Sequence, residues 1–159
     1  MSLLLGCSKT PSTIEQALEQ RHIQYDKILK TLDTTNELVI LIYTNKDKIT
    51  NEDKLNIGLL KHKKNDWSWV IGQNSAIDKD ADIDWAYTNM DEKNPMFVDN
   101  DKIKKIVIQT KKIEKEATIQ QSDNLTYFYL MMDDPQYPPM KMTGYDLSGK
   151  VVYVSGSLD

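Results

Sequence analysis

The chain has 159 residues, of which 40% are hydrophobic and 28% charged, a composition typical of a globular protein that buries a core without disulfides or metals. Its formal net charge of -4 argues against nucleic-acid binding, because that binding depends on clustered Lys and Arg that release counterions from phosphates. The sequence holds no run of about 18 apolar residues, so it predicts no membrane-spanning helix.

A helix is predicted over residues 13–32. Ser12 can cap the first turn, and Glu15, three residues later, can reciprocate. Apolar residues then recur at steps of three, four and seven until the run D-T-T-N, which begins at Asp33, breaks the pattern. These apolar residues are Ile14, Leu18, Tyr25, Ile28, Leu29 and Leu32.

From Glu37 the pattern changes to that of β-strands. The run L-V-I-L-I-Y after Glu37 is short, continuous and rich in β-branched residues, which predicts a central strand buried on both faces. Alternating apolar residues at 55–59 and 67–70, separated by H-K-K-N-D, predict a hairpin.

The C-terminal part of the chain is also rich in strand signals. Three strands, at 104–110, 117–121 and 125–132, are predicted to form an antiparallel meander. Asp146 and Gly149 are placed to begin and end a tight turn between two final strands.

Residues 74–100 are the segment with the weakest pattern. They hold the acidic runs D-K-D-A-D-I-D and D-E-K-N-P, and we interpret them as a long connection between two halves of the sheet. The alternative is a short helix around Trp85 and Tyr87. The chain as a whole predicts an α+β fold, with the N-terminal helix packed on a mainly antiparallel, strongly twisted sheet of about seven or eight strands.

The first acidic run also holds the candidate metal ligands. Asp78, Asp80 and Asp82 alternate along the chain, and carboxylates on a curved loop can converge on a hard cation such as calcium. The run does not match an EF-hand, because Ile83 stands where the sharp-turn glycine belongs and Asn89 where the closing glutamate belongs. We expect at most weak calcium binding and no other cofactor, the alternative being a solvated acidic linker.

Catalytic candidates are few. His22 lies in the predicted helix, and His62 lies near the hairpin turn among lysines that give it no orienting carboxylate. We interpret both as solvated surface histidines. Asp133 and Asp134 precede a proline, which is typical of a solvated turn, although two acids facing each other across a cleft leave no linear spacing to read. No catalytic residue is predicted.

Four side chains are candidates for ligand or partner binding. Trp67 and Trp69 share one face of a predicted strand, which is typical of core packing or of an aromatic binding platform. Tyr137 and Met140 belong to a loop over residues 133–140 that contains three prolines, which remove backbone donors and stiffen the chain. We therefore expect Tyr137 and Met140 to be exposed on a recognition loop, the alternative being that Tyr137 folds back over the sheet.

The sequence begins with an apolar stretch, L-L-L-G-C, followed by the polar stretch S-K-T-P-S-T. Leu4, Gly6 and Cys7 resemble the lipobox of bacterial lipoproteins of the Gram-positive kind. The resemblance implies that Cys7 carries a diacylglycerol, which anchors the protein in the outer leaflet of the cell membrane, on the extracytoplasmic side. Residues 1–12 are then a lipobox remnant and tether, and residues 13–159 a single globular domain. The alternative is that Cys7 is an ordinary free thiol.

The function predicted from the sequence is that of a non-catalytic extracytoplasmic lipoprotein domain. Its partners are expected to be the membrane, through the anchor at Cys7, and a protein or small-molecule ligand, with no nucleic acid. An extracytoplasmic hydrolase that uses carboxylates is the alternative.

Overall fold

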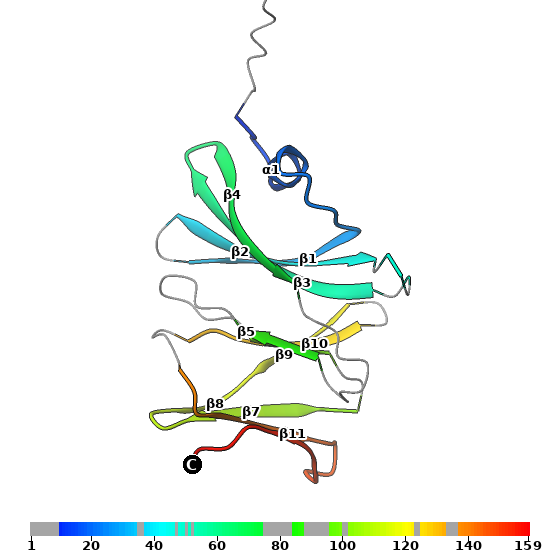
Figure 1. Ribbon diagram of the computed structural model, residues 1–159, viewed down its shortest axis with the longest axis vertical. Coiled ribbons are helices and arrows are strands. Elements are labelled where there is room, and N and C mark those ends of the chain that lie inside the picture. Colours follow the sequence, from blue (N-terminus) through cyan, green and yellow to red (C-terminus); the bar gives the residue numbers. More distant parts are fainter. Residues whose placement is uncertain are drawn as a thin grey trace, which may run out of the picture. The chain divides into compact units, whose positions relative to one another are not determined.

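The protein is described from a computed structural model, which defines residues 10–34, 37–46, 48–49, 51, 53–74, 84–87, 96–99, 102–122, 125–132 and 137–159. The chain forms two compact units, Met1–Gly72 and Gln73–Asp159, which are described separately (Figure 1). The prediction of a single domain after residue 12 stays a prediction. No helix in the described part of the chain is long and apolar enough to cross a membrane.

Unit 1 begins with helix α1, Ile14–Gln20. The residue that caps it is Thr13, one position after the predicted Ser12: its hydroxyl accepts a hydrogen bond from the backbone N–H of Gln16 at 3.2 Å. The side-chain oxygen of Gln16 reaches back to accept from the backbone N–H of Ser12 at 2.8 Å. The arrangement is similar to the predicted capping box, but the cap is Thr13 and the Gln16 side chain bonds to Ser12, the residue before the cap, instead of to the cap itself.

Helix α1 ends far earlier than predicted. The N–H of His22 donates to the carbonyl of Glu19, and the N–H of Ile23 donates to the carbonyl of Leu18, both at 2.9 Å. With His22 at a positive φ of 55°, this is the Schellman pattern that closes a helix. Ile23 packs against the cluster that contains Leu18, which is the apolar contact that accompanies such an ending.

Residues 27–32 of the predicted helix belong to a strand, β1, Lys27–Asp33, which pairs antiparallel with β2. Leu29 has no partner in the ladder, because the register shifts between Ile28 and Lys30. Ile28 and Leu32 are four residues apart, a spacing that suits one face of a helix. In the observed strand the unpaired Leu29 sends them to opposite faces.

The sheet of unit 1 has the order β1-β2-β3-β4. The remaining strands are β2, Leu38–Lys46, β3, Asp53–Lys63, and β4, Asp66–Asn74. The central strand β2 is buried from Val39 to Thr44, as its continuous apolar run predicts. β3 and β4 form the predicted hairpin through Lys64 and Asn65, and Lys64 takes a positive φ of 59°.

One face of this sheet is covered by α1. Ala17 and Leu18 of the helix form a buried cluster with Leu41, Tyr43 and Leu60 of the sheet. The register sets Leu41 opposite Gly58 and Tyr43 opposite Asn56, so these residues share the face that carries the helix.

Unit 2 contains two four-stranded sheets, with the orders β5-β6-β10-β9 and β12-β11-β7-β8. The strands of the first sheet are β5, Asp84–Tyr87, β6, Met96–Asp99, β9, Thr118–Ser122, and β10, Leu125–Leu130. Those of the second are β7, Lys105–Thr110, β8, Glu114–Glu116, β11, Met140–Tyr145, and β12, Val151–Ser155.

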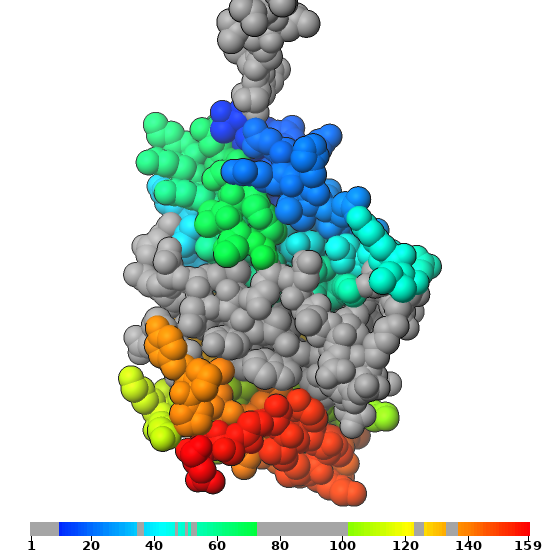
Figure 2. Space-filling model, viewed as in Figure 1, coloured from blue at the N-terminus to red at the C-terminus, as the bar shows by residue number. Residues whose placement is uncertain are grey.

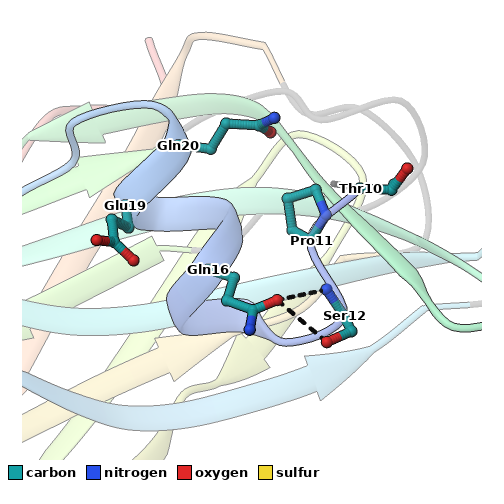
Figure 3. A pocket seen from close by; sticks show the side chains of 6 residues that line it. All are labelled: Thr10, Pro11, Ser12, Gln16, Glu19 and Gln20. Atoms are coloured by element: carbon teal, nitrogen blue, oxygen red, sulfur yellow. Dashed lines mark hydrogen bonds between the residues drawn. The ribbon is translucent and has the colours of Figure 1, made fainter. Parts of the chain in front are cut away.

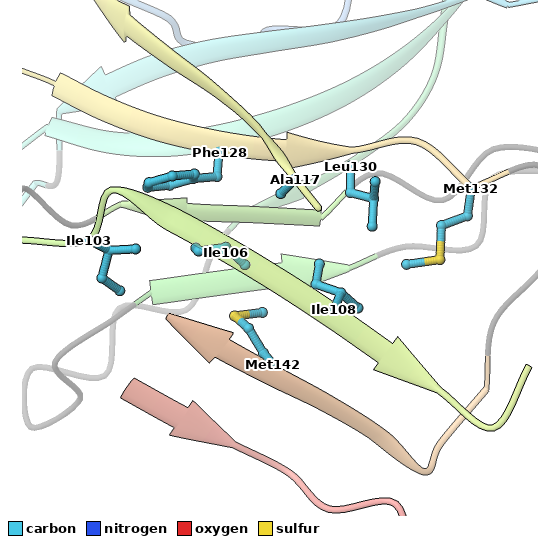
Figure 4. Close-up of a cluster of buried hydrophobic side chains, with 8 residues drawn as sticks. All are labelled: Ile103, Ile106, Ile108, Ala117, Phe128, Leu130, Met132 and Met142. Atoms are coloured by element: carbon cyan, nitrogen blue, oxygen red, sulfur yellow. The ribbon is translucent and has the colours of Figure 1, made fainter. Parts of the chain in front are cut away.

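The core of unit 2 lies between its two sheets (Figure 4). Phe128 and Leu130 of β10 pack with Ile106 and Ile108 of β7 and with other buried side chains. Ala117, between β8 and β9, is part of this core, and its N–H donates to the carbonyl of Ile106 at 2.9 Å. The chain passes from one sheet to the other at this residue.

The described residues therefore form a mainly β protein, and the predicted α+β class with seven or eight strands is wrong. One helix of seven residues stands beside twelve strands in this part of the chain. The predicted meander is correct only in its last two strands: β9 and β10 pair antiparallel, but β7 belongs to the other sheet. Residues 84–87 and 96–99 are paired strands within the segment predicted to be a long connection.

Candidate functional site

The two edges of the sheet β12-β11-β7-β8 differ sharply in charge. Edge strand β8 consists of Glu114, Lys115 and Glu116, and charged residues on an edge discourage pairing with another chain. Edge strand β12, with the sequence V-V-Y-V-S, has no charged residue. Its valines at positions 151, 152 and 154 are 47%, 44% and 52% exposed.

The register of β12 shows how much of this edge is regular. Val154 pairs with Thr143 and Tyr153 with Gly144, but a register shift between Gly144 and Tyr145 leaves Val152 without a partner on β11. The regular part of the edge is thus Tyr153–Ser155, next to a bulge that exposes Val152. Tyr153 packs toward the core, so Val154 points to the outer face of the sheet.

A hollow of about 620 Å³ lies on this face, here called the outer-face hollow. It is lined by Val107 and Tyr145, by Lys105 and Glu116, and by the turn that joins β11 to β12. Lys105 and Glu116 form an ion pair of 2.9 Å. The hydrogen bond from Lys105 to Glu116 raises the pKa of Lys105, so the rim of the hollow carries fixed charges of both signs.

The turn beside the hollow is organised by Asp146. One carboxylate oxygen accepts from the backbone N–H of Ser148 at 2.8 Å, from the Ser148 hydroxyl at 2.7 Å and from the backbone N–H of Lys150 at 3.0 Å. These bonds lower the pKa of Asp146, with the Ser148 hydroxyl as the largest cause. Gly149 has a φ of 82°. The predicted tight turn between Asp146 and Gly149 is confirmed.

Tyr137 is 68% exposed, as the proline-rich sequence around it predicts. Met140 is half-buried and is not part of a loop: it is the first residue of β11 and pairs with Thr110. The alternating pattern M-K-M-T-G-Y begins at Met140 itself, which is the signal that the loop prediction overlooked. The role of Tyr137 and Met140 in binding stays a prediction.

Trp67 and Trp69 both pack against the cluster under α1. The ring of Trp67 stacks on His62, with centroids 4.0 Å apart, and the ring of Trp69 meets Tyr43 edge-on at 6.3 Å. A Cβ atom at Gly58 would clash with the ring of Trp69, so the glycine provides the space that the indole fills. The two rings are therefore half-buried and pack against the unit 1 core, and their role in binding stays a prediction.

A second hollow, of about 630 Å³, lies beside the start of α1 and is called the α1 hollow. It is lined by residues of the helix and of the segment before it (Figure 3): Thr10, Pro11, Ser12, Gln16, Glu19 and Gln20. The side-chain oxygen of Gln16 is directed at Ser12, where it closes the helix cap. Two of the lining residues, Ser12 and Gln16, are thus already bonded to each other at the helix cap.

Most of the remaining predicted residues carry no described geometry. Cys7, the candidate calcium ligands Asp78, Asp80 and Asp82, and the acids Asp133 and Asp134 lie outside the described residues. Within the described ranges, no group of three His, Cys, Asp or Glu side chains is arranged to hold a metal. His22 was predicted to lie within the helix. It is exposed and lies just after the end of α1.

Sequence reasoning missed the uncharged edge of β12. The run V-V-Y-V gave a strand, but the position of that strand at an edge depends on the sheet order, which no local pattern reveals. Comparisons with known proteins do not supply a function either: the chain matches no protein-family model, no curated protein and no solved structure.

Proposed function

We propose that this chain is the extracytoplasmic domain of a bacterial lipoprotein, anchored through a diacylglycerol on Cys7, and that it binds a partner protein without catalysis. The anchor is supported by the likeness of Leu4, Gly6 and Cys7 to a lipobox and by the polar residues that follow. Two acyl chains hold a protein to a bilayer stably, where one gives marginal binding.

The observation that carries the binding proposal is the uncharged, exposed edge of β12. An edge strand presents backbone N–H and C=O groups that an extended segment of another protein can pair with, and alternate side chains then set the specificity. Charge blocks this pairing at β8, at the other edge of the same sheet. The partner is therefore a protein segment in extended conformation that adds beside Tyr153–Ser155 and covers Val154.

The anchor is tested by mass spectrometry of the mature protein from its native host. A diacylglycerol adduct on Cys7 is expected, together with partition into the membrane fraction, while a Cys7→Ser variant stays unprocessed or soluble. An unmodified Cys7 would overturn this part of the proposal.

The binding edge is tested by photo-crosslinking on living cells. A photoreactive amino acid at position 154, on the uncharged edge, is expected to give a crosslinked product of one discrete mass. The same residue at position 115, on the charged β8 edge of the same sheet, is the matched control and is expected to give none. Equal products from the two positions, or no product from position 154, would contradict the proposal.

A further inference from the structure

The point at which the tether joins unit 1 is fixed by the fold. Pro11 is buried, and its carbonyl accepts a hydrogen bond of 2.8 Å from the backbone N–H of Trp67 in β4. Trp67 lies just after the turn of the β3–β4 hairpin and stacks on His62. Figure 2 shows the tip of this hairpin beside the dark blue atoms with which the described chain begins.

The distance from the anchor follows from chain length. Cys7 and Thr10 are separated by three peptide units, which span at most about 11 Å. If Cys7 is lipidated, as proposed above, Thr10 cannot lie farther than that from the membrane surface. The Debye length at physiological ionic strength is about 8 Å, which is similar to this maximum reach, so charges around Pro11 come within range of the lipid headgroups whenever the tether is not fully extended.

The charges on the two elements next to Pro11 have opposite sign. The hairpin segment 61–66 carries three lysines, Lys61, Lys63 and Lys64, against one acid, Asp66, a net charge of +2 (three minus one). All four side chains are exposed. Helix α1 carries Glu15 and Glu19 and no basic residue, a net charge of -2, which Arg21 at its C-cap reduces to -1 (-2 plus 1).

We propose that the β3–β4 hairpin of the anchored protein contacts anionic phospholipid headgroups, with its lysines on the phosphates and the acidic helix α1 turned away. A short tether leaves unit 1 free to tilt but not to move off the surface. An anionic surface attracts the hairpin and repels Glu15 and Glu19, so both elements favour the same tilt. This inference rests on the proposed anchor and deepens it by naming the face that meets the membrane.

The chain offers a direct test, because Cys7 is its only cysteine. The full chain is coupled through Cys7 to a maleimide lipid in vesicles of phosphatidylcholine, with or without phosphatidylglycerol. A water-soluble amine reagent then labels the lysines, and peptide mass spectrometry measures the labelling rate of each. We expect Lys61, Lys63 and Lys64 to be labelled several-fold more slowly on the anionic vesicles than on the neutral ones.

Lys46 and Lys48 are the internal control. Both are exposed and belong to unit 1, at the opposite end of β3 from the hairpin, because Lys46 pairs with Asp53 whereas Lys61 pairs with Leu38. We expect their labelling to be the same on both vesicles. A K63E/K64E variant is expected to lose the protection of Lys61, while a K46E/K48E variant keeps it. Equal labelling of the hairpin lysines on the two vesicles, or equal effects of the two variants, would overturn the inference.

Chemical coupling also separates this inference from the anchor itself. The vesicle experiment supplies the lipid artificially, so its result does not depend on processing in the host. A Cys7 that is unmodified in cells would overturn the anchor alone, whereas unprotected hairpin lysines on anionic vesicles would overturn the hairpin contact alone.

Discussion

His22, the residue that ends helix α1, has a backbone conformation that favours glycine. Its φ is 55°, in a region that costs an L-residue roughly 1–2 kcal/mol. A glycine avoids this cost but destabilises the fold by about 0.4–1 kcal/mol, because its unfolded chain has more conformational freedom. We expect His22→Gly to raise the free energy of unfolding by about 0.5–1 kcal/mol in urea titrations. His22→Ala is the control and gives no gain. A glycine variant no more stable than the alanine variant would show that the helix ending is not strained.

Asp146 gives the β11–β12 turn a dependence on pH. Its pKa is lowered from 3.8 in the folded protein by hydrogen bonds from Ser148 and Lys150. A lowered pKa means that the ionised carboxylate stabilises the fold above its ordinary pKa, and that this stability disappears as the pH falls through the folded value. In urea titrations at several pH values, the stability difference between wild type and Asp146→Asn should be largest at neutral pH and shrink below about pH 4. A difference independent of pH would contradict this role.

At the scale of elements, the packing of β3 against Trp69 depends on the missing side chain of Gly58. A Cβ atom there would clash with the indole, and overpacking of this kind typically costs about 1–3 kcal/mol. We expect Gly58→Ala to destabilise the protein by that amount in chemical denaturation. In a Trp69→Leu background the same substitution should cost much less, because the smaller side chain leaves room. Equal costs in the two backgrounds would show that the cost of Gly58→Ala does not come from a clash with Trp69.

The elements that the sequence predicted well carry their signal locally. The β-branched run after Glu37 is strand β2, and Asp146 and Gly149 bound the turn they were expected to bound. The helix was predicted to be too long for two reasons. No glycine marks its end, where His22 takes the positive φ instead. The spacing of Ile28 and Leu32 also suits one face of a helix.

The fold and the candidate site also depend on contacts that are distant in the sequence. The chain changes sheets at Ala117, and no residue there signals the change. Likewise β12 is an edge because, among the described strands, it pairs with β11 alone, whose other side pairs with β7. The exposure of Tyr137 could be predicted, because nearby prolines exclude it from a ladder.

At the scale of the whole molecule, the uncharged edge of β12, which we propose binds a partner, is also expected to favour self-association. We expect Val154→Lys, which adds a charge to this edge, to reduce light scattering when concentrated protein is heated, and to change stability by about 0.5 kcal/mol or less. The substitution changes the net charge from -4 to -3 (-4 plus 1). A smaller net charge favours association, so reduced scattering would have to come from the position of the new charge.

Leu147→Lys is the control, because it makes the same change in charge at an 89% exposed turn residue off the strand edge. If it suppresses scattering as strongly as Val154→Lys does, the edge of β12 is not where the molecules meet.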